Sequence, residues 1–198
     1  MKFVYPPGAT PLDPEDAAAL KQSHITTQGQ LDEWEFKNVA EGNRWAYTRR
    51  KDNILSIEFM QQLHRRMFDD TWRWAGVIRT KETLPVGIAP EKIRVALKTL
   101  CQDVEVQIKD GTWRIEEIAA RFHHRLVYVH PFPNGNGRFS RTMADLMLVQ
   151  KGRDLFTWGP DLGRNGEGRE RYISALQAAD GKDYGPLFAL LGIAGSNQ

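Results

Sequence analysis

The chain has 198 residues, the size of one ordinary domain and too few for two comfortable ones. Hydrophobic residues make up 41% and charged residues of both signs 26%, which excludes wholesale disorder and allows a substantial core. The formal net charge of +2 argues against a nucleic acid partner, although a local basic pocket is compatible with it.

The single cysteine, Cys101, excludes an intramolecular disulfide, and it falls within an apolar helical pattern that is typical of a buried small residue. No stretch of the sequence is apolar for long enough to serve as a signal peptide or to span a membrane. We therefore expect a cytoplasmic protein with no membrane partner.

The first third of the sequence predicts an arm and two helices. Residues 1–15 are rich in Pro, Gly and Asp and predict an arm on the surface. Apolar residues between positions 30 and 49 recur at helical spacing, and Gly42 marks either a break or a close approach within that helix. Residues 57–68 predict a strongly amphipathic helix with Ser56 as its N-cap.

The remaining elements are helical apart from one segment. In residues 76–90, Val, Ile and Thr flank a central turn, which predicts a short β-hairpin or an extended loop. Helical patterns then cover residues 90–108, 113–130, 138–152, 168–180 and 184–192. The sequence therefore predicts an all-α, mostly helical fold, namely a single bundle with a short β-hairpin flap.

One stretch, HPFPNGNGRFSR, has the composition of an anion site. Pro131 and Pro133 end the preceding helix and stiffen the turn. Gly135 and Gly137 permit backbone conformations that a side chain would block, and a new helix begins beside them. The first N–H groups of that helix have no intrahelical partners and point back at the loop, so they can bind an anion.

Three side chains surround this helix N-terminus. Arg138 and Arg141 are three residues apart, share one helix face and can hold phosphate oxygens. His130 lies at the other end of the loop, where a neutral imidazole can take a proton from a hydroxyl that attacks a bound phosphate. The pattern indicates a phosphoryl- or nucleotidyl-transfer site, and the alternative is a plain surface turn beside a solvated arginine pair.

The segment HPFPNGNGR resembles the signature of the Fic family, H-P-F-x-[DE]-G-N-[GK]-R, at every defined position but one. The segment LHRRMFDDTWRWAGVIRT resembles the family's upstream helix and the start of its flap, and YISALQAADGKDYGPLFALL resembles its closing helices. The segment SHITTQGQLDEWEFKNVAEGNRWA is similar to the Fic subgroup called mobile mystery protein B. Together these segments cover most of the chain.

The resemblance implies a protein adenylyltransferase that uses ATP and Mg²⁺ and moves AMP onto a Ser, Thr or Tyr hydroxyl of a protein substrate. It implies that His130 is the catalytic base and that residues 78–88 form a flap that aligns the target segment by strand-like pairing. The implied nucleotide-binding residues are those of the anion hole, Gly135, Asn136 and Gly137, and those that hold the β- and γ-phosphates, Arg138 and Arg141.

The sequence departs from the signature at Asn134, where the family usually has the Asp or Glu that binds Mg²⁺. Asparagine offers only a neutral carbonyl oxygen, whereas Mg²⁺ prefers charged oxygens, so we expect a weak metal site fed by Mg-ATP. Asp145 lies two helical turns beyond Arg138, or about 10 Å, which is too remote for it to substitute.

Many Fic proteins carry an inhibitory helix with the motif [ST]-x-x-x-E-[GN]. The segment KNVAEGNR supplies Glu41, with Lys37 in place of the Ser or Thr. By motif position, Glu41 is the regulatory residue that would pair with Arg141 and displace the γ-phosphate, and the alternative is a solvated helix glutamate. Glu35 is a weaker rival, with Leu31 at the equivalent place.

We expect residues 1–50 to form the N-terminal arm and the candidate inhibitory helix, packed on a Fic-like catalytic domain of residues 51–198. The subgroup resemblance implies a toxin-like context with a regulatory or antitoxin-like protein partner, and a homo-oligomer is left open. Two other functions are also left open. One is a catalytically weakened nucleotide-binding or protein-interaction module, and the other is a Fic enzyme that transfers a phosphoryl or phosphocholine group.

Overall fold

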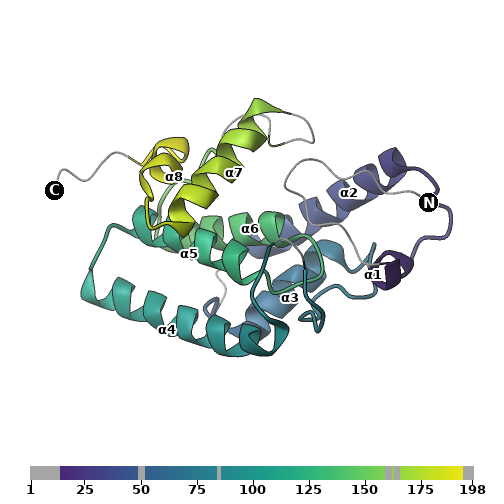
Figure 1. Ribbon diagram of the computed structural model, residues 1–198, viewed down its shortest axis with the longest axis horizontal. Helices are drawn as coiled ribbons and strands as arrows, with labels where there is room; N and C mark the ends of the chain where they lie inside the picture. Colours follow the sequence, from purple (N-terminus) through teal and green to yellow (C-terminus); the bar gives the residue numbers. More distant parts are fainter. Residues whose placement is uncertain (1–13, 49–51, 84–85, 159–161, 163–165, 194–198) are drawn as a thin grey trace.

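The computed structural model describes residues 14–48, 52–83, 86–158, 162 and 166–193 and places them in an all-α fold (Figure 1). The helices are, in chain order, α1 (Pro14–Ala18), α2 (Gln28–Tyr47), α3 (Ile57–Phe68), the 3-10 turn η1 (Pro90–Lys92), α4 (Ile93–Asp110), α5 (Ile115–Val129), α6 (Asn136–Gln150), α7 (Glu167–Asp180) and α8 (Gly185–Leu190). The prediction of an all-α, mostly helical bundle is confirmed.

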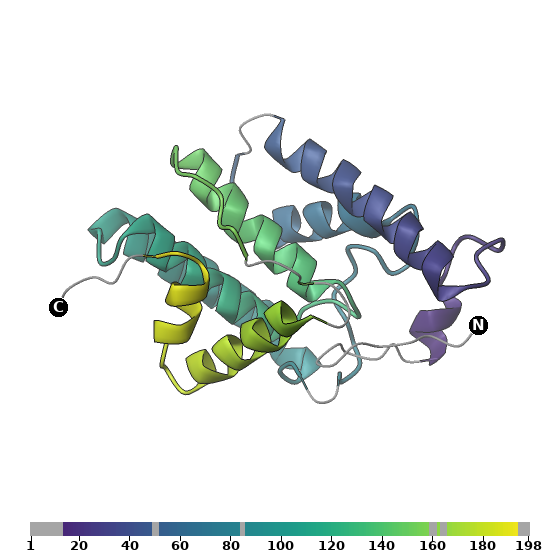
Figure 2. The ribbon, with the colours of Figure 1, turned by 90° about the horizontal axis from the view of Figure 1, so that it is seen from above.

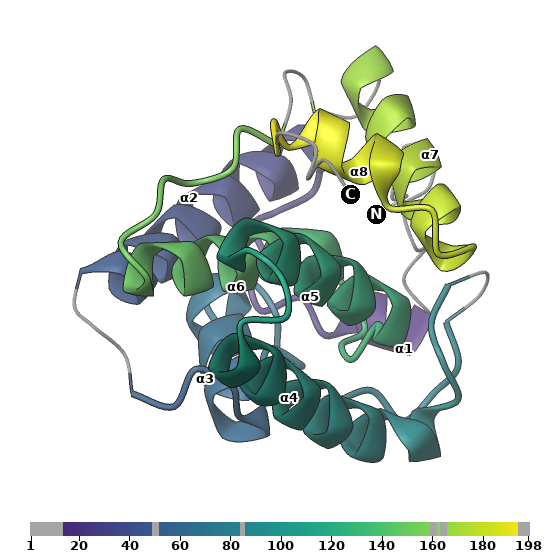
Figure 3. The ribbon, with the colours of Figure 1, turned by 90° about the vertical axis from the view of Figure 1, so that its left-hand side faces the viewer.

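Helices α5 and α6 lie at the centre of the bundle, and the glycine-rich loop joins them. Helix α4 packs along α5, whereas α2 and α3 pack on each other and against α6 (Figures 1 and 2). Helices α7 and α8 form a pair that rests on α5 (Figure 3). Helix α2 thus packs on α3 and α6, while the division of the chain into two parts at residue 50 stays a prediction.

The hydrophobic core runs between these helices and includes Cys101, which is buried as expected. Its largest fully buried side chains are Trp72, Phe68, Phe122, Phe132, Phe139, Met60, Leu63, Met67, Ile93, Leu97, Ile118 and Leu126. Two of them, Phe132 and Phe139, belong to the motif and anchor it to the core with ring centroids 5.1 Å apart. Within the described ranges, none of the helices combines the length and the apolar character needed to cross a bilayer.

The first turns of α2 and α3 are fixed by side-chain caps. Ser56 accepts a hydrogen bond from the backbone N–H of Phe59, which confirms the predicted N-cap of α3. Helix α2 begins with a capping box in which Thr27 accepts from the N–H of Gln30, and the Gln30 side chain accepts from the N–H of Thr27. Each cap satisfies donors that the helix leaves unpaired.

The predicted β-hairpin is wrong for the part of residues 76–90 that the structure describes, because it contains no strand. Side chains take the place of the cross-strand ladder: the Thr83 hydroxyl donates to the carbonyl of Val86 at 2.7 Å. The Arg79 guanidinium donates to the carbonyls of Lys81 and Ile88, one on each limb of the segment. The β-branched residues that suggested strands instead belong to a loop whose two limbs are joined by hydrogen bonds from side chains to backbone carbonyls.

Helix α2 approaches α3 closely at Gly42. A Cβ atom at this position would lie 2.7 Å from the Cα and 2.8 Å from the backbone nitrogen of Met67. Real structures avoid such distances, so the contact between the two helices requires glycine at this position. Of the two interpretations offered by the sequence, the close approach is therefore confirmed, and α2 continues through Gly42 without a break.

We expect Gly42→Ala to lower the free energy of unfolding by about 1–3 kcal/mol, the usual cost of overpacking, although alanine is the better helix former. Gly29→Ala is the matched control, because a Cβ there has no atom within 4 Å, and it should add about 0.5–1 kcal/mol. Urea unfolding of the two variants measures both effects. If both variants changed the free energy of unfolding by the same amount in the same direction, the close approach of α2 and α3 at Gly42 would be contradicted.

Candidate functional site

The candidate site is the loop between α5 and α6, whose polar backbone groups are bound by side chains from several elements. Phe132 donates its N–H to Asn136 Oδ1 at 2.9 Å, and its carbonyl accepts from Asn136 Nδ2 at 2.7 Å. The carbonyl of Asn134 accepts from Nε2 of His64 at 3.0 Å. The loop is therefore held in one conformation before any ligand binds.

His64 holds this loop as a neutral residue. Its Nδ1 accepts from the N–H of Gly76 at 3.0 Å, so the ring proton is on Nε2, which donates to Asn134. Burial lowers the pKa of His64 to about 3, because the charged ring would lose its hydration. The ring also stacks on Phe132 with centroids 3.8 Å apart. The sequence does not reveal these partners, because they come from distant segments of the chain.

His130 ends α5 in the left-handed conformation, with φ 53° and ψ 61°. Its Nδ1 lies 3.3 Å from the carbonyl of Val127, which can only accept, so Nδ1 carries the proton and Nε2 carries the lone pair of the neutral ring. Burial lowers the pKa of His130 to about 4, and the ring is therefore neutral at physiological pH. A neutral imidazole with its lone pair on Nε2 is the form that a general base requires.

The flap covers this histidine. His130 is only 8% exposed, and a Cβ on Gly87 would lie 3.0 Å from the Cβ of His130. The flap around Gly87 therefore packs directly over the side chain of His130.

The N-terminus of α6 has the geometry of an anion cradle. Gly135 precedes the helix with φ 77°, and a Cβ there would lie 2.5 Å from the ring of Phe68. Around Gly137, by contrast, the nearest atom to an added Cβ is the Arg141 guanidinium at 3.7 Å. The first-turn N–H groups are not used within the helix, and the helix dipole adds partial positive charge.

The side chain of Asn136 has a structural role here. It is 2% exposed, and both its oxygen and its nitrogen bind the backbone of Phe132. Both polar atoms of the side chain are thus engaged within the loop, so the binding role that the resemblance implied for Asn136 would require its backbone N–H. The side chain instead fixes where the cradle lies.

Asn134 does not build a magnesium site with its neighbours. Its single amide oxygen accepts the N–H of Gly135 at 2.6 Å. Asp145 is buried and occupied, because it accepts from Trp158 Nε1 at 2.8 Å and from the N–H of Phe156 at 3.3 Å. Burial raises the pKa of Asp145 to about 6. Among the described residues no three metal-binding side chains gather, so the donor set does not fit an Mg²⁺ held by the protein.

A third arginine, one more than the motif predicts, lies within electrostatic reach of Arg138 and Arg141. Arg138 lies with its guanidinium carbon 4.7 Å from the centroid of the Phe68 ring, and Arg141 lies 5.7 Å from that of Tyr172. Helix α7 adds Arg169, whose pKa is lowered by burial and then by the positive charges of Arg141 and, to a lesser extent, Arg138. No motif pointed to Arg169, since it lies in an ordinary polar stretch of α7.

The acidic residue that reaches this cluster is Glu35. Its Oε2 forms a salt bridge with the Arg138 guanidinium at 2.8 Å, and its Oε1 accepts from Trp72 Nε1 at 2.6 Å. The expected pair between Glu41 and Arg141 is absent from the described residues, and Glu41 is exposed.

Helix geometry explains this correction. Leu31, Glu35, Asn38 and Gly42 lie four, three and four residues apart and form the face of α2 that packs inward. Glu41 lies off this face. The periodicity of α2 therefore identifies the glutamate that pairs with Arg138 better than the inhibitory motif does. Neither Glu35 nor Glu41 has the Ser or Thr of that motif four residues before it.

Known proteins resemble this chain in sequence. The model of the Fic/DOC family matches residues 54–148. Protein adenylyltransferase fic-1 of Caenorhabditis briggsae is 30% identical over 135 residues, which are 67% of this chain and 25% of that protein. The probable protein adenylyltransferase y4lH of Sinorhizobium fredii is 28% identical over 149 residues, 68% of this chain and 72% of that protein. The chain thus spans about a quarter of the nematode relative.

Solved structures share the fold. Fic-1 of C. elegans superposes with a TM-score of 0.65 and 25% identity over 85% of this chain and 55% of that one. The BepC protein of Bartonella tribocorum, with bound AMPPNP, gives a TM-score of 0.69 with 18% identity over 94% of this chain and 100% of that one.

We expect Asn134→Asp to strengthen the contribution of Mg²⁺ to nucleotide binding by on the order of tenfold, or about 1.4 kcal/mol. An aspartate can accept the N–H of Gly135 with one oxygen and offer a charged second oxygen to the metal. Calorimetric titration of ADP with and without Mg²⁺, on both proteins, measures the difference. An identical gain from Mg²⁺ in both would show that position 134 does not face the metal.

Proposed function

Because the chain belongs to the Fic/DOC family, we propose that it is a protein adenylyltransferase, which transfers AMP from ATP to a hydroxyl side chain of a target protein. The observation that carries this proposal is the neutral His130, with its lone pair on Nε2, at one end of a rigid loop whose other end is the N-terminus of α6. Relatives named as protein adenylyltransferases support the reaction class.

In this reaction, Nε2 of His130 takes the proton of the target hydroxyl, and the hydroxyl oxygen forms a bond to the α-phosphorus of ATP. The bond between the α-phosphorus and the oxygen that bridges to the β-phosphate breaks, and pyrophosphate leaves with those electrons. The cradle N–H groups of α6 stabilise the charge that develops on the phosphate oxygens. Arg138 and Arg141 hold the leaving phosphates in line with the attacking oxygen.

The positive charge of the site comes mainly from arginine side chains and a helix N-terminus of the protein itself. Arg138 and Arg141 lie in the first turns of α6, Arg169 is close enough to feel their charges, and together the three can offset several phosphate charges. Since Asn134 brings no carboxylate, any Mg²⁺ would be held chiefly by the phosphates of ATP, where it would neutralise phosphate charge.

Glu35 restrains the site by occupying Arg138. Its side chain is 14% exposed and that of Arg138 is 32%, so the pair is partly desolvated, and it is worth more than a surface ion pair. Trp72, itself 1% exposed, holds the second carboxylate oxygen at 2.6 Å. A phosphate that binds Arg138 must displace this carboxylate or share the guanidinium with it, and like charges oppose the sharing.

The test of the proposed function is incubation with ATP labelled at the α-phosphate, followed by intact-mass measurement of the protein and of candidate targets. His130→Ala should lower the transfer of AMP by about 10²–10⁴-fold, the usual contribution of a general base. His24→Ala is the matched control, because His24 is exposed and lies outside the site. Transfer that is indifferent to the loss of His130 would overturn the proposal.

The restraint predicts that Glu35→Ala raises both the affinity for ATP and self-modification by on the order of tenfold, which corresponds to about 1.4 kcal/mol. Glu41→Ala is the control on the same helix and should match the wild type. Calorimetry and intact mass provide the two readouts. A gain with Glu41→Ala and none with Glu35→Ala would restore the assignment made from the motif.

A second candidate is a nucleotide-binding module with little or no transfer activity. The engaged amide oxygen of Asn134 and the low exposure of His130 favour it. In that case, Glu35→Ala should bind ATP without adding mass to any protein. An added mass of phosphate or phosphocholine, given a suitable donor, would instead indicate another transfer reaction at the same site.

A further inference from the structure

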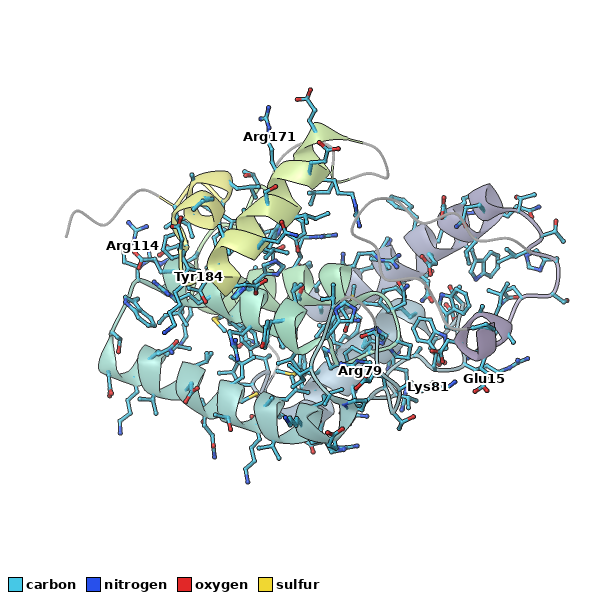
Figure 4. All side chains as sticks on the ribbon, viewed as in Figure 1. Glu15, Arg79, Lys81, Arg114, Arg171 and Tyr184 are labelled. Carbon is cyan, nitrogen blue, oxygen red and sulfur yellow. The ribbon has the colours of Figure 1, made fainter. Side chains whose placement is uncertain are left out.

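Arg79 is a buried arginine, 5% exposed, that lies between the flap and the catalytic loop. Figure 4 shows it on the same side of the molecule as Lys81 and Glu15, the pair that ties the flap to α1 through a salt bridge of 2.6 Å. The mechanism proposed above gives Arg79 no role, yet a buried charge of this kind is costly unless all its donors are used.

Arg79 binds three consecutive carbonyls at the start of the catalytic loop. Its Nε donates to the carbonyl of His130 at 2.6 Å, and its guanidinium also lies 3.4 Å from the carbonyl of Val129. Its backbone N–H donates to the carbonyl of Pro131 at 2.9 Å. The first two carbonyls end α5 and have no partner within the helix, so the guanidinium acts as a charged C-cap.

The same side chain binds both limbs of the flap. One terminal nitrogen donates to the carbonyl of Lys81 at 2.8 Å, and the other donates to the carbonyl of Ile88. These carbonyls lie on either side of the flap tip. Gly87, next to Ile88, has a φ of 111°. A Cβ atom on Gly87 would lie 2.7 Å from a terminal nitrogen of the Arg79 guanidinium. Glycine therefore lets the returning limb reach the arginine.

This geometry depends on arginine rather than on positive charge alone. A planar guanidinium carries five N–H donors in a fixed fork, and here the fork spans two flap carbonyls and two loop carbonyls. A lysine offers three donors on a single nitrogen and cannot reach both limbs and the loop together. The left-handed conformation of His130, which costs a non-glycine residue about 1–2 kcal/mol, also needs such external support.

We propose that Arg79 is a positioning residue that holds the flap and His130 as one unit and so sets the distance between a target segment on the flap and the imidazole. This inference deepens the proposed adenylyl transfer and rests on it for its consequence in catalysis. Among the described residues, the hydrogen bonds of Arg79 go to the flap and the loop and not to the cradle at the start of α6. Its loss should therefore affect transfer without affecting nucleotide binding.

The variant Arg79→Lys tests the proposal against Arg73→Lys, an exposed arginine six residues earlier in the same segment. Hydrogen exchange measured by mass spectrometry is the first readout, because it does not depend on activity. Peptides that cover residues 77–90 and 126–137 should both exchange faster in Arg79→Lys, while those of α4 and α7 stay as in the wild type. Faster exchange in the flap alone, faster exchange evenly across the molecule, or faster exchange in neither segment would overturn the proposal that Arg79 joins the flap to the loop.

Self-modification kinetics in the Glu35→Ala background provide the second readout. Arg79→Lys should lower kcat by about 100-fold, as a misplacement near 1 Å does, and leave the Kd for ATP within about twofold. A loss confined to ATP affinity would contradict a positioning role. If the parent shows no transfer at all, the proposed function fails, while the exchange result still decides whether Arg79 joins the two segments.

Gly87→Ala approaches the same contact from the flap and keeps the proposal testable if Arg79→Lys does not fold. The added methyl group lies too close to the guanidinium and requires an unfavourable positive φ. Gly87→Ala should therefore speed up hydrogen exchange in the same two segments. An exchange pattern like that of the wild type would count against the proposal that Arg79 joins the flap to the loop.

Discussion

The constraint on which this structure depends is the satisfaction of backbone polar groups in a loop that has no regular structure of its own. A buried carbonyl or N–H without a partner costs free energy comparable to a lost hydrogen bond. Here side chains from other parts of the fold supply those partners: Arg79 from the flap, His64 from α3 and Asn136 from the first turn of α6. The conformation of the loop is therefore set by contacts within the protein and does not depend on a bound ligand.

The same loop keeps His130 in a fixed position relative to the N-terminus of α6, which the proposed function requires of a base and a phosphate site. His130 and the cradle are joined by a short segment whose ends are fixed by Phe132 and by the start of α6, so neither end moves alone. Above this rigid platform, Glu35 provides the adjustable part, because an ion pair to Arg138 can be exchanged for a phosphate without disturbing the core. In the proposed function, the rigid loop would therefore serve catalysis, and the ion pair between Glu35 and Arg138 would serve regulation.

Much of this could be predicted from the sequence, because local rules apply to it. Helical periodicity predicted the bundle, Ser56 predicted the start of α3, and the motif predicted the loop that the structure places between α5 and α6. The hairpin failed because the side chain of Arg79 replaced a strand ladder, and β-propensity cannot anticipate a side chain bound to two limbs.

The predicted pairing of Glu41 with Arg141 is not found in the described part of the chain, for a related reason. A motif compares residue types along the chain, whereas the pairing of Glu35 with Arg138 depends on which face of α2 packs inward and where α6 crosses it. The contributions of Arg169 and of the Asn136 side chain likewise depend on contacts between distant elements. The sequence predicted which residues gather at the site, whereas their contacts with one another follow from tertiary packing.

The most direct test of the central claim is a crystal structure of the Glu35→Ala protein with a non-hydrolysable ATP analogue. The account predicts that the phosphates lie on the first-turn N–H groups of α6, with Arg138 and Arg141 on their oxygens and Nε2 of His130 facing the α-phosphorus. Phosphates bound elsewhere, with the cradle empty and His130 still sealed beneath the flap, would contradict it.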